Sequence, residues 1–199
     1  MAVAVNIELD RGDDLPVAAA RRVVATRTGR TGYPDEHAVG VAECARRIAD
    51  QLRLRPDLRR TVIEGALLHD VGKLAVDAAI LTKPGPLTPD ERRQVNTHPA
   101  EGERLVRGAV DERVGDVVRA HHERWDGGGY PRGLSAHGIP FAARVVAVAD
   151  AFLAMLEQRP YRSAMSRQAA LDELRTCSGS QFDPVCVEAL ATIVEAASR

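Results

Sequence analysis

Apolar positions recur at helical spacing along most of the chain and predict a series of amphipathic helices. The clearest stripe follows Asp35, which has the character of an N-cap, and continues to about Arg53. Pro56 predicts the start of the next helix along the chain, and the Gly72-Lys73 step predicts its end. Runs of alternating Val, Ile, Thr and aromatic residues are scarce, so the pattern predicts an all-α fold.

Capping and breaker residues mark the later helices. Thr88-Pro89-Asp90-Glu91 forms a capping box with proline at the first helical position, which predicts a helix start. This helix is expected to end at His98-Pro99, because proline disfavours the α conformation of the residue before it. The other predicted helices cover about 16–26, 101–107, 114–121, 140–156, 166–176 and 184–197.

Composition supports one compact domain with a core of aliphatic and alanine side chains. The chain has 199 residues, of which 45% are hydrophobic and only 4% aromatic. The strong helical patterns lie in residues 35–199, which are therefore expected to form the domain. Residues 1–34 are too few for a domain of their own and are expected to act as a packing or linker segment.

Net charge and the length of apolar runs argue against a nucleic-acid-binding protein and against a membrane-spanning one. The formal net charge of -1 gives no field that attracts a nucleic acid polymer, so local charges must hold any anionic ligand. No stretch reaches the roughly 20 uncharged apolar residues of a membrane span, and the first residues do not resemble a signal peptide. Cys44, Cys177 and Cys186 form no CxxC pair, which argues against disulfides and a thiolate zinc site. A cytoplasmic protein without membrane contact is expected.

An adjacent His69-Asp70 pair lies near the end of the helix predicted to start at Pro56. Val62, Ala66 and His69 follow helical spacing, so the imidazole projects from the buried face and Asp70 follows it into the interior. A buried carboxylate beside an imidazole costs several kcal/mol unless it is compensated, and a divalent metal compensates both groups. Taken alone, the pair is better explained as a core histidine that is hydrogen-bonded to a helix-terminal aspartate.

The other histidines favour the metal interpretation. Of six histidines, only His137 is expected in a plain turn, and Asp150 is a second aspartate within an apolar helical run. The seven candidate ligands exceed what one metal normally uses, so the sequence predicts two metal ions. The seven are His37, His69, Asp70, His98, His121, His122 and Asp150.

A glycine-rich stretch follows the His121-His122 pair. Glycines 127–129 permit positive φ values and a close approach of backbone to a ligand, and Tyr130-Pro131 stiffens the exit. The alternative is a helix C-cap followed by a turn, which the position after two histidines disfavours. Residues 159–162 are expected to form an irregular basic turn, and a solvated turn without a functional role is one interpretation of it.

Together these residues resemble the HD-GYP family, a branch of the HD metal-dependent phosphohydrolases that degrades cyclic di-GMP in bacteria. The resemblance covers about His37 to Leu190. A second Gly-Tyr-Pro at 32–34 lacks the HHE and glycine context and is given no weight. The motifs that carry the resemblance are HDVGK (69–73), LTKPGPLTPDE (81–91), HPAEG (98–102), HHERWDGGGYP (121–131), VAD (148–150), RPYR (159–162) and SQFDP (180–184).

The resemblance implies an HD-type helical bundle with a binuclear centre and a metal-bridging hydroxide as nucleophile. Iron or manganese suits the mixed imidazole and carboxylate donors, with zinc as the third candidate. One ion would be held by His37, His69, Asp70 and Asp150. The second would share the bridging Asp70 with His98, His121 and His122.

The resemblance also implies roles around the substrate. Lys73 would offset charge on the phosphoryl oxygens, and Arg159 and Arg162 would hold the second phosphate. The guanine end would be shaped by Gly129, Tyr130 and Pro131.

Two positions depart from the family. Tyr33 stands where a Glu often precedes the first histidine ligand, which argues against a third metal. Leu153 stands where the VAD motif usually continues to a second Asp, so a hydrogen bond near the site is expected to be weaker or absent.

The leading hypothesis is a cyclic di-GMP phosphodiesterase that yields linear pGpG, with further cleavage to GMP left open. Two alternatives remain open: a cyclic-dinucleotide sensor module without hydrolysis, and a phosphohydrolase of another cyclic nucleotide such as cyclic GMP-AMP. A homodimer and a regulatory protein partner are equally open. Bound metal and reaction product, measured on one purified sample, separate these hypotheses.

Overall fold

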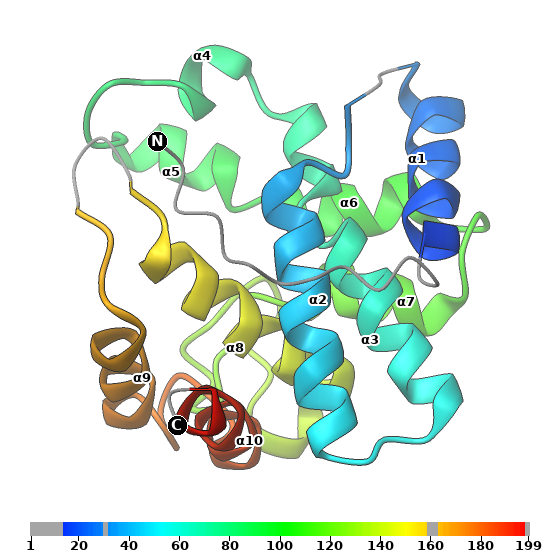
Figure 1. The fold of residues 1–199 in the computed structure, drawn as a ribbon. Coiled ribbons are helices and arrows are strands. Elements are labelled where there is room, and N and C mark those ends of the chain that lie inside the picture. The colour runs from blue at the N-terminus through cyan, green and yellow to red at the C-terminus, as the bar shows by residue number, and fades with distance from the viewer. Residues whose placement is uncertain (1–13, 30–31, 159–162, 198–199) are drawn as a thin grey trace.

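The computed structural model describes residues 14–29, 32–158 and 163–197, with side chains from residue 17 onward. Within these ranges the chain forms α-helices and two short 3-10 helices, with no strand beyond one isolated bridge between Ser178 and Phe182. The all-α prediction is therefore confirmed (Figure 1). The helices are α1 (Asp14–Thr28), α2 (Glu36–Gln51), α3 (Pro56–Leu68), η2 (Val71–Ala75), α4 (Ala78–Leu81), α5 (Pro89–Val95), α6 (His98–Val106), α7 (Glu112–Ala120), η3 (Ala136–Gly138), α8 (Phe141–Leu156), α9 (Arg167–Thr176) and α10 (Pro184–Ala196).

The centre of the bundle is built from α2, α3 and α8. These helices pack against one another, α7 covers α3, and α6 packs on η2 and α7. Small side chains allow a close approach: Ala45 and Ala149 are fully buried, and a Cβ on Gly65 of α3 would lie 2.5 Å from Val117 Cγ1 of α7. A core of alanine and aliphatic residues therefore brings several helix ends together.

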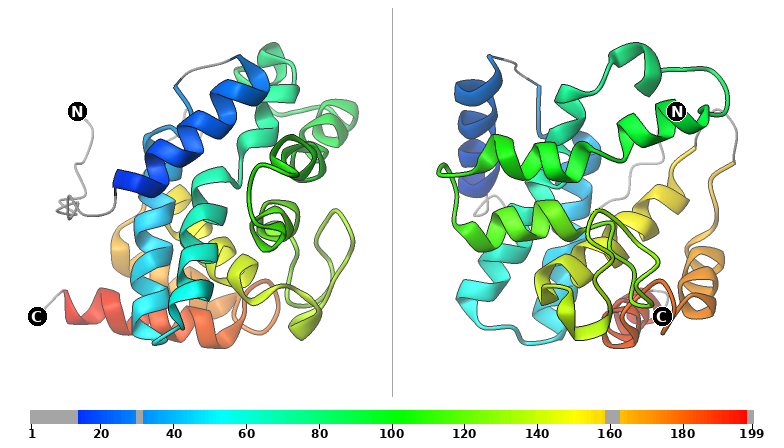
Figure 2. Two further views of the ribbon diagram at one scale, coloured as in Figure 1. Left: turned by 90° about the vertical axis from the view of Figure 1, so that its right-hand side faces the viewer. Right: turned by 180° about the vertical axis from the view of Figure 1, so that it is seen from behind.

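The remaining helices cover two ends of this core. Helix α1 packs on α3 and α6, whereas α9 and α10 pack on α8 at the opposite end of the molecule (Figure 2). None of the described helices is long and apolar enough to cross a lipid bilayer.

Several predicted helix starts are confirmed by their caps. Asp35 accepts the backbone N–H of Ala38 at 2.9 Å, Thr88 and Glu91 form the full capping box, and Asp183 caps α10. The prediction for His98 was wrong in one respect. Helix α5 already ends at Val95, and His98 opens α6, because a proline in the first helical turn lacks only an N–H that would be unpaired there.

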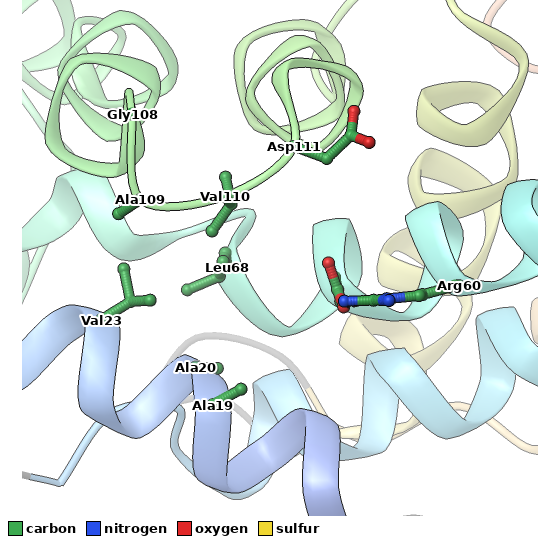
Figure 3. A pocket seen from close by; sticks show the side chains of 10 residues that line it. Ala19, Ala20, Val23, Arg60, Leu68, Gly108, Ala109, Val110 and Asp111 are labelled. Atoms are coloured by element: carbon green, nitrogen blue, oxygen red, sulfur yellow. Dashed lines mark hydrogen bonds and ion pairs between the residues drawn. The ribbon is translucent and has the colours of Figure 1, made fainter.

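A cavity of about 360 Å³ lies on the α1 side of the molecule. It is bounded by α1, α3 and the connection between α6 and α7, and Arg60, Glu64 and Asp111 provide its polar lining (Figure 3). None of the seven candidate ligands lines this cavity. It is therefore separate from the histidine cluster.

Candidate metal centre

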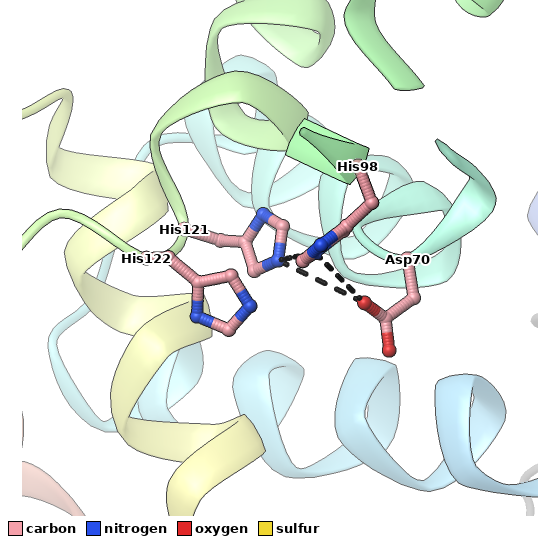
Figure 4. A group of neighbouring side chains, drawn as sticks. All are labelled: Asp70, His98, His121 and His122. Carbon is pink, nitrogen blue, oxygen red and sulfur yellow. Dashed lines mark hydrogen bonds and ion pairs between the residues drawn. The ribbon is translucent and has the colours of Figure 1, made fainter. Parts of the chain in front are cut away.

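Asp70 is shared by two groups of potential metal ligands. One group joins it to His98, His121 and His122 (Figure 4). The other joins it to His37 and His69. In each group the donor atoms lie within 4.8 Å of one another, so a single carboxylate reaches both.

Helix ends supply most of these side chains. His69 is the C-cap of α3, Asp70 begins the turn into η2, and His121 is the C-cap of α7. His98 opens α6 and His37 lies in the first turn of α2. Several helix ends thus meet at the cluster, and Asp150 joins them from the interior of α8.

Three imidazoles are oriented by the same backbone contact. Nδ1 of His69, His98 and His121 lies 2.7 Å from the carbonyl oxygen three residues earlier, that of Ala66, Val95 and Val118 respectively. A carbonyl can only accept, so each Nδ1 carries a proton and Nε2 is the ring nitrogen left to present a lone pair to a metal. The three Nε2 atoms therefore face the cluster as metal donors.

The inward-facing atoms lack partners of their own. Nε2 of His98 and Nε2 of His121 are 3.2 Å apart, although both are acceptors in the tautomer that the carbonyls impose. Nε2 of His69 and Oδ1 of Asp70 are buried without a hydrogen bond. Two facing lone pairs and a buried carboxylate oxygen repel one another unless a cation lies between them, so this donor set fits divalent metal ions.

Asp150 completes the group around His37 and His69. Its Oδ1 lies 3.1 Å from Nε2 of His37 and 3.9 Å from Nε2 of His69. Although burial acts to raise it, the hydrogen bond to His37 and the charge of His69 hold the pKa of Asp150 below its usual range. The pKa of Asp70 is lowered in the same way, against its burial, by His69 and His98. Both carboxyls are therefore ionised.

His121 and His122 stay neutral in the metal-free chain. Burial, together with the neighbouring His122, lowers the pKa of His121. Burial and the nearby His98 lower the pKa of His122 to about 4. Neutral imidazole is the ligand form, so these two side chains need no deprotonation before they bind a metal.

Lys73 and Tyr130 border the cluster. The ammonium of Lys73 forms an ion pair with Oδ2 of Asp70, and its side chain is 42% exposed. The Tyr130 ring stacks on His122. Both are positioned at the boundary between the buried ligands and solvent.

The glycine loop folds tightly back onto the residues that follow His121. Among residues 127–129 only Gly127 has a positive φ, of 83°. A Cβ on Gly129 would lie 2.3 Å from the backbone nitrogen of Arg124. Gly127 thus uses the positive φ that glycine permits, and Gly129 is required by the tight fold of the loop onto residues 122–124.

Glu123 holds this loop, although the sequence reasoning gave it no role. Its side chain is buried and accepts the backbone N–H of Arg132 at 2.7 Å and of Leu134 at 2.9 Å. The SQFDP segment adds two backbone bonds, from Trp125 to Gln181 and from Asp126 to Ser180. An acidic residue directly after the histidine pair was the available signal for Glu123.

Tyr33 lies beside the cluster of histidines and aspartates. Its hydroxyl is buried without a hydrogen-bond partner, and burial followed by the charges of Asp70 and Asp35 raises the pKa of the phenol well above 10. The neighbouring Glu36 is exposed and belongs to neither ligand group among the described residues. A neutral phenol therefore occupies the position of the absent carboxylate.

The remaining candidates lie elsewhere. His137 is in η3, where it contacts Trp125 and approaches Arg144, and it joins neither ligand group. Arg159 and Arg162 lie outside the described residues. Their proposed phosphate contacts are not tested by this structure.

Comparisons with known proteins show the family of the chain. A family model described as "HD domain" matches residues 16–186. The cyclic di-GMP phosphodiesterase response regulator RpfG of Xanthomonas campestris pv. campestris is 45% identical over 146 residues, which cover 72% of this chain and 39% of that protein. The 3'3'-cGAMP-specific phosphodiesterase 3 of Vibrio cholerae is 38% identical, over 81% of this chain and 35% of that protein. The chain thus spans well under half of the length of either relative.

A solved structure shares the fold. The cyclic GMP-AMP specific phosphodiesterase V-cGAP3 of V. cholerae superposes with a TM-score of 0.67 and 20% identity, over 92% of this chain and 48% of that one. This likeness extends over nearly all of the bundle.

Proposed function

The chain belongs to the HD domain family and carries the motifs of its HD-GYP branch, and from this premise we propose that it is a metal-dependent phosphodiesterase that hydrolyses cyclic di-GMP to linear pGpG. The observation that carries the proposal is the position of Asp70, whose carboxylate serves both groups of histidines. A shared carboxylate is the arrangement that holds two ions for an in-line displacement at phosphorus.

The proposed centre contains two divalent ions, with iron or manganese favoured and zinc as the third candidate. One ion is assigned to His37, His69, Asp70 and Asp150. The other is assigned to Asp70, His98, His121 and His122. When bound, the ions supply Lewis-acid stabilisation of the phosphoryl oxygens and lower the pKa of water so that it becomes a nucleophile.

The protein contributes orientation and charge. The backbone carbonyls behind His69, His98 and His121 fix the donor atoms before any ligand arrives, which avoids reorganisation during the reaction. Lys73 is assigned to the developing negative charge on the phosphoryl group. Its ammonium is partly exposed and already held at the cluster by Asp70, so it can reach a substrate phosphate without leaving the site.

Two substrate subsites complete the proposal. Gly129, Tyr130 and Pro131 are assigned to the guanine end from the family motif, and the stack of Tyr130 on His122 supports this by placing the ring beside the cluster. Arg159 and Arg162 are assigned to the second phosphate on the strength of the family motif alone.

The test is to incubate metal-loaded protein with cyclic di-GMP and to separate the nucleotides by chromatography. We expect linear pGpG with iron or manganese and no product from Asp70→Ala. If the protein binds cyclic di-GMP tightly but hydrolyses it with none of these metals, the result would favour a sensor module over an enzyme.

A second substrate is favoured by one observation. The relative that acts on 3'3'-cGAMP is 38% identical over 81% of this chain, which is close to the similarity of the cyclic di-GMP relative. Parallel assays with cyclic di-GMP and 3'3'-cGAMP at equal concentrations decide between the two. Faster turnover of 3'3'-cGAMP would reassign the substrate and leave the phosphodiester chemistry unchanged.

A cytoplasmic location completes the proposal. Cys44, Cys177 and Cys186 are all free thiols in the described structure. Free cysteines are typical of a reducing compartment, and this supports the cytoplasm.

A further inference from the structure

His37 is oriented by a side chain, unlike the three histidines that backbone carbonyls orient. Its Nδ1 lies 2.6 Å from Oε1 of Glu157, while its Nε2 lies 3.1 Å from Oδ1 of Asp150. The cause is its place in the chain, since His37 lies in the first turn of α2. The other three each follow the end of a helix, α3, α5 or α7, whose last carbonyls are free to accept, whereas the described residues just before α2 are not helical.

Glu157 reaches His37 from the end of another helix. It is the C-cap residue of α8, seven positions after Asp150, so both carboxylates project from the same face toward α2. A negative charge at a helix C-terminus opposes the helix dipole and does not stabilise α8. The position of this carboxylate is therefore explained by its contact with His37 and not by helix capping.

Leu153 lies between these two carboxylates on α8. Its Cδ1 packs against α2 so closely that a Cβ on Gly40 would lie 2.9 Å from it. Leu153 thus fills an apolar contact at the position where the family motif usually has a second aspartate. The nearest carboxylate along the helix is one turn later, at Glu157, and this is the one that meets the imidazole.

We propose that Glu157 is the positioning residue for His37 and strengthens the metal site of His37, His69, Asp70 and Asp150. The carboxylate accepts the Nδ1–H and so directs Nε2 toward Asp150, and it makes Nε2 a stronger donor once a metal replaces the Nε2 proton. Glu157 thereby provides the carboxylate that hydrogen-bonds to His37, which the apolar Leu153 side chain cannot provide. This inference rests on the proposed function only for the presence of metal, and it is independent of the nucleotide.

The position of Glu157 makes it testable by substitution. The orienting groups of His69, His98 and His121 belong to the backbone and cannot be removed by mutation, whereas the Glu157 side chain can. Glu157→Ala removes both the hydrogen bond and the charge. Glu157→Gln keeps an acceptor oxygen of the same reach but removes the charge.

The experiment is a titration of the metal-free full chain with Mn²⁺ or Zn²⁺ against a chromophoric chelator, without nucleotide. We expect Glu157→Ala to weaken one of the two sites about 10- to 100-fold, the usual effect of losing a partner behind a metal-bound histidine. Glu157→Gln should give a smaller loss, and the second site should keep its affinity. Glu195→Ala is the matched control, because Glu195 is 46% exposed against 42% for Glu157 and pairs with the distant Arg175.

A second readout follows the histidine itself. In zinc-loaded protein labelled with ¹⁵N-histidine, the His37 Nδ1–H resonance should be visible in the wild type and exchange-broadened in Glu157→Ala. Thermal unfolding of each variant shows whether the bundle is intact. Three results would overturn the inference. The first is unchanged affinity at both sites in both Glu157 variants, and the second is an equal loss of affinity at the two sites. The third is a wild-type chain that binds no divalent ion. Failure to hydrolyse cyclic dinucleotides would overturn the proposed function and leave this result standing.

Discussion

Tyr130 stacks on His122, with ring centroids 4.9 Å apart and an interplanar angle of 28°. This contact joins the loop after the glycine triplet to the ligand cluster. The His122 ring also contacts the rings of His98 and His121, so Tyr130 holds it on the side of the loop.

The stack predicts different effects for two substitutions of Tyr130. Tyr130→Phe should keep metal content and affinity, because the ring is retained. Tyr130→Ala should weaken the metal site that includes His122 by about 10-fold, since a lost partner behind a ligand has effects of that order. Chelator competition on both variants measures this. Equal affinity in Tyr130→Ala would show that His122 is held by other contacts.

Asp70→Ala should remove metal and activity together. The carboxylate faces Nε2 of His69 at 3.4 Å and Nε2 of His98 at 3.2 Å, so both ions would lose the negative charge between them. Elemental analysis of the purified variant checks the metal content, and a nucleotide assay checks the activity. His137→Ala is the control and should retain both, because His137 joins neither ligand group. Two ions retained by Asp70→Ala would contradict the ligand assignment.

Gly72→Ala should disrupt the site through the backbone. A Cβ at this position would lie 1.9 Å from the carbonyl oxygen of His98, where η2 packs on α6. The two elements must separate, at a cost of about 3 kcal/mol in unfolding free energy, and His98 moves with them. Chemical denaturation measures the change. In Gly138→Ala the new Cβ meets nothing within 4 Å, so this control should unfold like the wild type.

The metal-free chain should lose stability as the pH rises from 6.5 to about 9. The hydrogen bond to Asp150, opposed by burial and aided by Glu157, raises the pKa of His37 from 6.5 to about 9. The folded chain therefore holds this proton more tightly than the unfolded chain. The contribution of His37 to the free energy of unfolding is therefore complete below pH 6.5 and is lost as the pH rises to about 9.

Metal affinity should rise over the same interval, because the metal must displace the proton from Nε2. Thermal unfolding with excess chelator, at a series of pH values, measures the stability. The difference between wild type and His37→Gln isolates this histidine. A difference that stays constant from pH 6.5 to 9 would contradict the prediction.

Tyr33 predicts a binuclear centre that releases pGpG. Its phenol is buried and its pKa is raised by burial and by Asp70, so it remains protonated and is a poor ligand. With two ions, opening of the ring should precede a slower second cleavage, because the freed terminal phosphate can block re-entry to the metals. Mass spectrometry for metal content and a chromatographic time course test this. Three ions per chain, or GMP without a lag, would contradict it.

The helices and their caps were determined by local sequence. Asp35, Thr88 and Asp183 act within three or four residues of themselves, so their effect can be predicted without knowledge of the fold. The same holds for the set of candidate ligands, since residue type and helical spacing indicate which side chains share a face. The end of α5 was misplaced because Pro99 is compatible with either a helix end or a helix start.

Only the tertiary structure decided how these side chains meet. His37 and Glu157 are 120 positions apart and touch because α2 packs on α8, a contact that no local pattern specifies. The pairing of His98 with His121 and the tight contact of Gly72 with His98 depend likewise on where α6 lies. Helical periodicity determines the face on which a residue lies, whereas the packing of side chains between helices determines which faces come within bonding distance.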